Sequence, residues 1–251
     1  MSRVFLTGAT GFVGGHVLRR LLEDGATTVT CLVRDPARLP AVDAAASPDD
    51  AESANPADRV RTVTGTLENP EAFADALADC DTVVHLAALT GKATEEEHFK
   101  ASARGTEKLL AAAKAAGVGR FLFMSTIAVA YPEKRAYPYA RAKEEAERLV
   151  RESGLDWMVL RPTVILGPGS GLWDKFLSLA SAPAMPVFGS GKNAMQPVHV
   201  DDVALCVAAA VAGERLGDRT REFGGRDTLP MKEFVQRIRK AAKGKDGPAV
   251  H

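Results

Sequence analysis

The chain lacks several features that mark whole classes of protein. It has only three cysteines among 251 residues, Cys31, Cys80 and Cys206, and their odd number and scattered spacing match neither a disulfide framework nor a metal site. No apolar run approaches the roughly 20 residues that a membrane-spanning helix needs. The N-terminus leads straight into an expected strand, which predicts that no signal peptide precedes the fold. We therefore expect a cytoplasmic protein that has no membrane span and binds no metal ion.

An excess of charge of either sign is also missing. Lysine plus arginine and aspartate plus glutamate both number 32, so the formal net charge is zero. Nucleic acids and acidic membrane surfaces attract proteins with a positive balance, so we expect neither as the main partner and expect a small-molecule substrate instead. Apolar residues make up 46% of the chain, which is ample for a core. The length permits one large domain, or a domain with a small appendage.

A glycine-rich turn lies near the N-terminus, between an expected strand at Val4–Leu6 and an apolar helical pattern at Val13–Leu22. A strand, a glycine turn and a helix together place a pyrophosphate on a helix N-terminus, because free backbone N–H groups and the helix dipole favour negative charge there. Gly8 would allow the tight turn. Gly11 would let the phosphates approach the backbone, and Gly14 would let the helix pack close to the strand. An ordinary turn with spare glycines is the alternative.

The end of the second expected strand, Thr28–Val33, bears on which dinucleotide is bound. About 20 residues after the glycine turn, NAD sites usually carry an acid that binds the ribose hydroxyls, whereas an arginine nearby suits a 2′-phosphate. Val33 stands at the acid position and Arg34 follows it. The sequence therefore favours NADP over NAD, with a solvated surface arginine as the alternative.

Strands and helices alternate through the next part of the chain. Strands are predicted at residues 59–64, 81–86, 120–125 and 157–161, and helices at 70–78, 95–116 and 139–153. This alternation predicts an α/β fold, a Rossmann-like doubly wound parallel sheet with helices on both faces. Small residues after the strand at 81–86 predict room for a ligand at its carboxyl end, with a plain strand end as the alternative. The helix at 139–153 carries glutamate and arginine at i,i+4 spacing, which predicts the ion pairs Glu144–Arg148 and Glu147–Arg151.

The regular alternation of strands and helices ends in the last third of the sequence. We predict an NAD(P)-binding Rossmann domain over residues 1–166 and a small C-terminal substrate-binding or lid region, interleaved with it, over 167–251. Glycines and prolines at 167–197 surround Trp173, Phe176 and Phe188, which predicts irregular backbone that walls a crevice. A plain connector is the alternative. Helices are predicted again at 201–212 and 231–242.

Tyr139 and Lys143 are the residues with the clearest chemistry. They lie four positions apart at the start of a predicted helix, so both side chains share one face. A phenol has a pKa of roughly 10, and a neighbouring ammonium lowers it. Tyr139 is therefore a candidate general acid/base. A hydroxyl on the preceding strand, Thr126 or Ser125, would hold the substrate oxygen. A solvated helix face is the alternative.

Together these segments resemble the short-chain dehydrogenase/reductase superfamily, in its NAD(P)-dependent epimerase/dehydratase branch. The resemblance covers nearly the whole chain. Five ordered motifs carry it: Thr7–Gly14, His85–Ala88, Tyr139–Lys143, Leu160–Thr163 and Pro197–Ala204. The stretches 154–162 and 223–225 are most similar to atypical members related to a respiratory complex I accessory subunit.

The resemblance implies roles for single residues. Tyr139 would be the acid/base, Lys143 would bind the nicotinamide ribose and lower the tyrosine pKa, and Thr126 would bond the reacting oxygen with Ser125 as backup. The implied cofactor-binding residues are Gly8, Thr10, Gly11, Phe12, Val13, Arg34, Thr66, Leu67, Leu86, Ala87, Ala88, Tyr139, Lys143, Pro162 and Val164.

The chain departs from the pattern of the family at three places. Thr66 stands where an aspartate near the adenine is usual, and Ser102 where an asparagine often begins a motif, which puts an Asn-dependent proton relay in doubt. Sugar-nucleotide enzymes usually carry an arginine just before the Pro197–Ala204 motif, but Ala194–Gln196 has no positive charge. Because arginine suits a bidentate phosphate clamp, its absence argues against a nucleotide sugar. Lys192 is a less specific substitute.

Three functions therefore compete. The first is an NADP-dependent oxidoreductase acting on a small, fairly apolar carbonyl or alcohol. The second is a sugar-nucleotide epimerase or dehydratase, and the third is a non-catalytic NADP-binding accessory protein. By analogy of fold, the helices that contain Leu109 and Leu149 are expected to form the seam of a homodimer.

Overall fold

The computed structural model describes residues 2–41, 56–181, 185–186, 190–243 and 249–250. The chain divides into two compact units. The first comprises Met1–Arg161 and Val203–Glu222, and the second comprises Pro162–Asp202 and Phe223–His251. The assignment of residues 167–251 to substrate binding stays a prediction.

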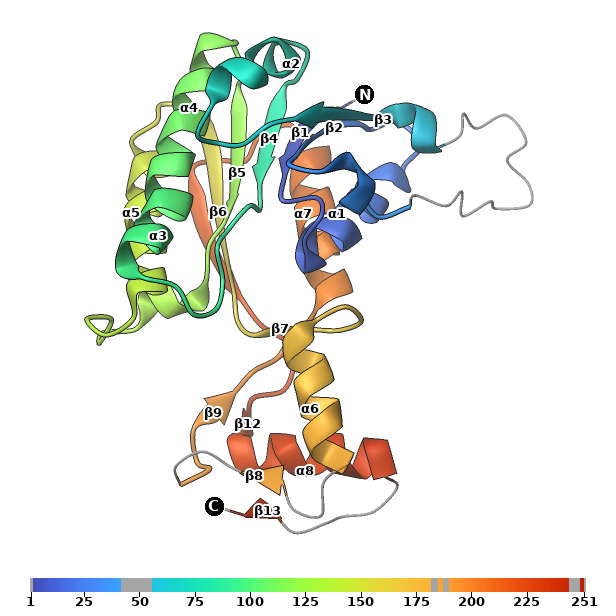
Figure 1. Ribbon diagram of the computed structural model, residues 1–251, viewed down its shortest axis with the longest axis vertical. Coiled ribbons are helices and arrows are strands. Elements are labelled where there is room, and N and C mark those ends of the chain that lie inside the picture. The colour runs from blue at the N-terminus through green and yellow to red at the C-terminus, as the bar shows by residue number, and fades with distance from the viewer. Residues whose placement is uncertain (1, 42–55, 182–184, 187–189, 244–248, 251) are drawn as a thin grey trace. The chain divides into compact units, whose positions relative to one another are not determined.

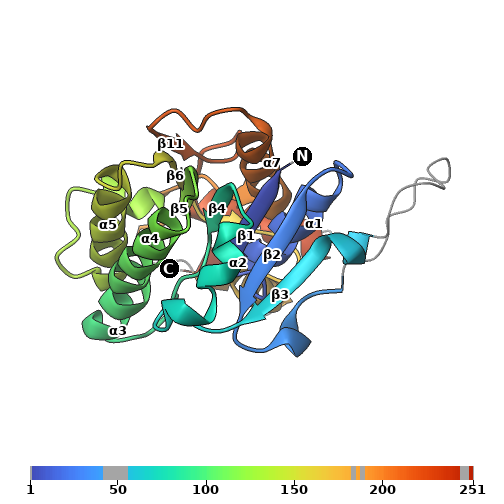
Figure 2. The same cartoon turned by 90° about the horizontal axis from the view of Figure 1, so that it is seen from above.

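A seven-stranded sheet forms the centre of the first unit (Figures 1 and 2). In spatial order its strands are β11 (Arg219–Phe223), β6 (Asp156–Pro162), β5 (Arg120–Met124), β4 (Thr82–His85), β1 (Arg3–Thr7), β2 (Thr28–Val33) and β3 (Val60–Thr64). The strands from β6 to β3 run parallel, with Leu6 of β1 opposite Cys31 of β2 and Val84 of β4. Their carboxyl ends therefore meet at one edge, where ligands of such sheets bind.

Helices cover both faces of this sheet. They are α1 (Phe12–Leu22), α2 (Ala74–Ala78), α3 (Glu95–Phe99), the π-helical segment η4 (Lys100–Arg104), α4 (Gly105–Ala115), α5 (Pro138–Arg151) and α7 (Val200–Ala212, its part from Val203). Short 3₁₀ turns are η1 (Pro36–Arg38), η2 (Pro56–Arg59), η3 (Pro70–Ala72) and η5 (Ile127–Ala130). Helices α2, α4 and α5 lie on one face, and α1 and α7 on the other (Figures 1 and 2). The predicted Rossmann-like doubly wound fold is confirmed. None of the helices described has the length and apolar character needed to cross a bilayer.

The core of the first unit includes side chains of the two helices that were expected to form a dimer seam. Leu109 of α4 is fully buried, and Leu149 of α5 packs against the same apolar cluster. On α5, Arg148 pairs with Glu145 at 2.7 Å and also with Glu152. Leu109 is therefore not available to a partner, and the homodimer stays a prediction.

The predicted ion pairs on α5 are half right. Arg151 does pair with Glu147. The pair Glu144–Arg148 was wrong, because Lys134 from the preceding loop reaches Glu144 at 2.6 Å and Arg148 turns to other partners. Spacing along one helix could not show a partner that comes from a loop.

The second unit is built on two helices, α6 (Gly171–Ser181) and α8 (Met231–Lys243). Its short strands are β7 (Ile165–Leu166), β8 (Met185–Pro186), β9 (Ala194–Met195), β10 (Val198–His199), β12 (Leu229–Pro230) and β13 (Ala249–Val250), which pair as β7–β10, β9–β12 and β8–β13. The prediction of irregular backbone at 167–197 was wrong over α6. Trp173 and Phe176 pack in the unit's own apolar cluster, where the Phe176 and Phe234 rings meet edge to face at 5.4 Å. Phe188 lies outside the described residues.

Candidate active site

The glycine turn has the geometry that its sequence predicts. Gly8 has a φ of +82°, a left-handed conformation that favours glycine, and a Cβ at this position would stand 2.7 Å from the Ala87 nitrogen. The Gly11 N–H donates to the Gly8 carbonyl at 3.0 Å. A Cβ on Gly14 would stand only 2.0 Å from that same carbonyl oxygen. The turn thus brings α1 against the end of β1 at a distance that no side chain permits.

The N-terminus of α1 is suited to an anion. Gly11 is its N-cap residue, no side chain caps it, and its first turn contains no acidic residue. The first N–H groups of a helix have no partner within it and carry the positive end of its dipole. These features and the bare glycine surface fit a dinucleotide pyrophosphate.

A cleft of about 630 Å³ opens beside this turn. The predicted cofactor residues that line it are Gly8, Thr10, Gly11, Arg34, Thr66, Leu67, Leu86, Ala87 and Ala88. The remaining ones lie elsewhere: Phe12 and Val13 begin α1, Tyr139 and Lys143 are on α5, and Pro162 and Val164 belong to the second unit. The cleft is thus bounded by the carboxyl ends of β1 to β4, as the doubly wound topology requires.

The π-helical segment also lines this cleft, and sequence analysis did not predict its part in it. Lys100 and Arg104 of η4 and Lys108 of α4 belong to the lining. The helical pattern at 95–116 gave no signal of a π turn, although π turns often occur at functional sites. Ser102, at the position expected to hold asparagine, is buried and its hydroxyl has no hydrogen-bond partner among the described residues.

Arg34 gives the cleft a positive charge at the end of β2. Its exposed side chain makes no hydrogen bond or ion pair with any residue that the structure describes. The neighbouring Asp35 carboxylate accepts from the Ala37 N–H at 3.0 Å and caps η1. By contrast, Lys100 pairs with Glu68 at 2.9 Å. The arginine is therefore available to an anion in the cleft.

A buried hydrogen-bond chain centred on His85 joins the glycine turn to the π-helical segment. The Thr106 hydroxyl donates to the Ser102 carbonyl at 2.5 Å, so it must accept from His85 Nε2 at 3.0 Å. His85 Nδ1 is then the acceptor for the Thr7 hydroxyl at 2.7 Å, and Thr7 Oγ1 accepts from the Ala87 N–H at 3.2 Å. Burial, and next the charge of Lys143, lowers the pKa of His85 to about 3. The imidazole is thus neutral and fixed in one tautomer.

Lys143 connects α5 to the end of β5. Its side chain is 1% exposed, its Nζ donates to the Met124 carbonyl at 2.8 Å, and the same atom lies 4.5 Å from the centre of the Phe123 ring. Burial lowers the pKa of Lys143 to about 7, while the charge of Glu147 acts in the opposite direction. The amine is thus close to losing its proton at neutral pH.

The pKa of Tyr139 departs from the prediction. We expected Lys143 to lower it, but burial, and next the neighbouring Tyr137, raises the pKa of Tyr139 to about 12. The ring of Tyr139 packs edge-on against His98 at 5.7 Å and against Tyr137 at 6.0 Å, and the Lys143 ammonium donates to Met124. The phenol therefore keeps its proton at neutral pH and can donate it.

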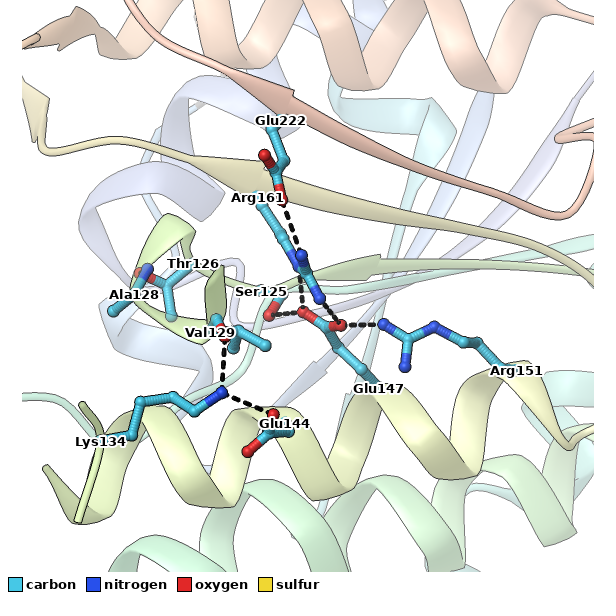
Figure 3. Close-up of polar contacts among 10 residues, drawn as sticks. All are labelled: Ser125, Thr126, Ala128, Val129, Lys134, Glu144, Glu147, Arg151, Arg161 and Glu222. Carbon is cyan, nitrogen blue, oxygen red and sulfur yellow. Dashed lines mark hydrogen bonds and ion pairs between the residues drawn. The ribbon is translucent and has the colours of Figure 1, made fainter. Parts of the chain in front are cut away.

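The two candidate hydroxyls at the end of β5 differ in what they bond. Thr126 Oγ1 accepts from the Ala128 N–H at 3.3 Å, so it caps η5 and keeps its own proton to donate. The buried Ser125 hydroxyl donates to Glu147 Oε1 at 2.5 Å (Figure 3). This arrangement favours Thr126 over Ser125 as the group that would hold a substrate oxygen.

Comparison with known proteins shows which family this cleft belongs to. A family described as NAD(P)H-binding matches residues 8–214. The chain belongs to this family. The match begins at Gly8 and includes all of α5, so it covers both the glycine turn and Tyr139. The resemblance to the short-chain dehydrogenase/reductase superfamily, in its epimerase/dehydratase branch, is confirmed.

Two curated relatives are named as reductases. The ceramide reductase of Caulobacter vibrioides is 31% identical over 207 residues, which are 82% of this chain and 60% of that protein. A 4-hydroxy-2-methyl-3-oxo-4-farnesyl-3,4-dihydroquinoline-1-oxide ketoreductase of Stigmatella aurantiaca is 33% identical over 232 residues, 85% of this chain and 65% of that protein. The chain thus spans less than two thirds of the length of these two relatives.

A solved structure has the same fold. The crystal structure of a double mutant of DesIV, a dTDP-glucose 4,6-dehydratase from Streptomyces venezuelae, with NAD bound, matches with a TM-score of 0.79 and 27% identity. The match covers 99% of this chain and 84% of that one. The family and this fold agree with the geometry of the cleft in pointing to an NAD(P) cofactor.

Proposed function

We propose that this protein is an NADP-dependent oxidoreductase that transfers hydride between nicotinamide and a small, fairly apolar carbonyl or alcohol. The observation that carries the proposal is the hydrogen bond from Lys143 to the Met124 carbonyl. It fixes the helix face that carries Tyr139 against the end of β5, where Thr126 follows. A protonated phenol, a hydroxyl donor and an ammonium on these two elements form an acid–base set beside a dinucleotide cleft.

Each side chain has a separate task in this proposal. The bound nicotinamide supplies or accepts the hydride. Thr126 donates a hydrogen bond to the carbonyl oxygen, Tyr139 gives that oxygen its phenolic proton, and solvent then returns a proton to the phenolate. Lys143 holds the ribose hydroxyls of the cofactor. Because burial raises the pKa of Tyr139 to about 12, the phenol is protonated at neutral pH and can give its proton to the carbonyl oxygen.

The preference for NADP rests on Arg34. The guanidinium lines the cleft beyond β2, and a planar, permanently charged donor suits a phosphate dianion. Asp35, which follows Arg34, accepts from the Ala37 N–H through Oδ1 and caps η1. These contacts favour a 2′-phosphate at this end of the cleft.

An apolar substrate is supported by aromatic side chains next to Tyr139. Tyr131 and Tyr137 are 50% and 43% exposed, and the Tyr137 ring lies 6.0 Å from that of Tyr139. The names of both reductase relatives, with ceramide in one and a farnesyl group in the other, denote apolar compounds. Apolar carbonyls are therefore the first compounds to test.

The likeness to DesIV keeps a sugar-nucleotide epimerase or dehydratase as a second candidate. Gln196 lies next to the position where such enzymes carry a phosphate-binding arginine. Its side-chain amide donates to the Gly225 carbonyl at 2.9 Å, and its backbone carbonyl accepts from the Thr163 hydroxyl. An amide held in this way supplies no positive charge to a diphosphate, which weighs against this candidate.

The test follows NADPH absorbance with a panel of apolar carbonyls and with nucleotide sugars. Replacing Tyr139 with Phe should lower kcat by about 100-fold or more, the usual contribution of a positioned acid, and leave NADPH affinity within about twofold. Full turnover in the Y139F variant would overturn the assignment. Conversion of a nucleotide sugar without net consumption of the cofactor would favour the second candidate.

A further inference from the structure

A buried carboxylate lies one helical turn beyond Lys143. Glu147 is 0% exposed, and both of its oxygens are fully bonded (Figure 3). Oε1 accepts from the Ser125 hydroxyl at 2.5 Å and from Arg161 Nε at 2.8 Å. Oε2 accepts from Arg161 Nη2 at 2.6 Å and from Arg151. Arg161 also donates to Glu222 of β11 at 2.7 Å, so the cluster joins α5, β5, β6 and β11.

Stability alone is a poor reason for such a cluster. Removing charges from water costs several kcal/mol per ion, and apolar residues of similar volume often replace a buried ion pair without loss of stability. Helix α5 already carries ion pairs on its surface, such as Arg148–Glu145, where no charge has to be buried. A buried and completely satisfied carboxylate at this position therefore calls for a function.

The cluster fixes the backbone that leads to the candidate active site. The Ser125 hydroxyl bonds Glu147, the Ser125 N–H donates to the Leu160 carbonyl at 2.7 Å, and the preceding Met124 carbonyl accepts from Lys143. Two successive residues at the end of β5 are thus tied to two successive turns of α5. Thr126 follows directly, and its orientation depends on these contacts.

The cluster also sets the charge around Lys143. Glu147 is on the same face of α5, at the i,i+4 position, where side chains meet. Among the residues that the structure describes, Tyr139 on the same helix contacts His98 of α3, and the neutral His85 of β4 lies within the electrostatic reach of Lys143. Arg151 and Arg161 bond Glu147. Glu147 is the carboxylate whose charge offsets the cost of burying the ammonium.

We propose that Glu147 is a positioning residue, which holds the end of β5 against α5 and keeps Lys143 in its ammonium form. Arg161 donates to both oxygens of this carboxylate and holds it in place. The importance of the charge on Lys143 rests on the proposed function, in which Lys143 binds the cofactor ribose. The ionic effect of Glu147 on Lys143 does not depend on that function.

The experiment compares Glu147→Gln with Glu145→Gln in the full-length protein. Both variants neutralise one carboxylate of α5, and only the first of the two is buried. The ¹³Cε resonance of Lys143 is identified as the signal that is missing from the spectrum of the Lys143→Met variant. Its chemical shift as a function of pH gives the titration midpoint of the Lys143 amine. In E147Q the titration midpoint should fall by about one pH unit, a shift of the size that a neighbouring opposite charge produces. In E145Q it should not move.

The pH profile gives a second readout. If the protein turns over as proposed, the alkaline limb of kcat/KM should move to lower pH in E147Q by the same amount, because the ammonium is lost earlier. A purely structural Glu147 would lower the melting temperature and leave both midpoints where they are. Equal midpoints for Lys143 in the wild type and E147Q would overturn the proposal.

A variant at the solvent edge of the cluster covers the case in which E147Q does not fold. Arg151 is 37% exposed at its side chain, so Arg151→Gln is expected to fold. Removing its positive charge should raise the Lys143 midpoint, the direction opposite to that of E147Q. A fall or no change would contradict the proposal. The Lys143 resonance can be measured without turnover. If the Lys143 midpoint shifts as expected but the protein reduces no carbonyl, the proposed function is refuted and the role of Glu147 stands.

Discussion

At the scale of single residues, burial shifts the pKa values of the titratable groups in the candidate active site. It raises the pKa of Tyr139 and lowers those of Lys143 and His85. The spacing of Tyr139 and Lys143 correctly predicted that the two share a helix, but it gave the wrong direction for the tyrosine. Neither the depth of a side chain nor the Met124 carbonyl that accepts from Lys143 can be derived from a four-residue spacing.

The buried histidine leads to a prediction about acid stability. His85 has a folded-state pKa of about 3, below its ordinary value near 6.5, so the unfolded chain binds more protons between these two pH values. Stability should therefore be lost as the pH falls below 6.5. For His85 alone the loss between pH 6.5 and 4.5 is on the order of 2 to 3 kcal/mol.

Urea unfolding at pH 7 and pH 4.5 measures this loss. Trp157 of the first unit serves as the fluorescent probe in a Trp173→Phe background. Replacing His85 with Gln should reduce the difference in the free energy of unfolding between the two pH values, whereas His16→Gln, at a partly exposed position, should not. An equal loss in the wild type and H85Q would mean that the histidine is not held neutral.

At the scale of elements, local sequence predicted what depends on neighbours in the chain. The strand, the glycine turn and α1 follow from residues 4–22, and the structure has them at Arg3–Thr7 and Phe12–Leu22. The π-helical turn at Lys100–Arg104 and helix α6 were missed. Gly105 packs its backbone close to Leu67, a contact between segments far apart in sequence, and the glycines and prolines near α6 hid its helical period.

Two neighbouring glycines of α1 provide a matched test of the turn. A Cβ at Gly14 would meet the Gly8 carbonyl oxygen at 2.0 Å, whereas a Cβ at Gly15 would meet only the Pro40 side chain at 3.2 Å. Gly14→Ala should lower the free energy of unfolding by about 3 kcal/mol, the upper end for an overpacked interior. Gly15→Ala should change it by less than about 1 kcal/mol, because the better helix propensity of alanine offsets the contact.

Denaturant unfolding of both variants, again followed at Trp157, separates the outcomes. If Gly14→Ala and Gly15→Ala cost the same, the close approach of α1 to the end of β1 does not limit the choice of residue at position 14.

At the scale of the whole molecule, the alternation of strands and helices was sufficient to predict the parallel sheet and the edge at which the cleft lies. It could not predict the Glu147 cluster, because Ser125 follows β5 while Arg161 and Glu222 belong to β6 and β11, and these segments meet α5 only in the folded chain. The central claim is that a dinucleotide binds across the carboxyl ends of these strands, with its pyrophosphate on the turn at Gly8–Gly14.

Isothermal titration calorimetry of the folded protein with NADPH and NADH tests this claim most directly. We predict saturable binding of both, at least tenfold tighter for NADPH, a difference of about 1.4 kcal/mol. Arg34→Gln should abolish that difference, and Arg38→Gln, an exposed arginine four positions on, should preserve it. The absence of binding heat with either dinucleotide, at several temperatures, would contradict the account.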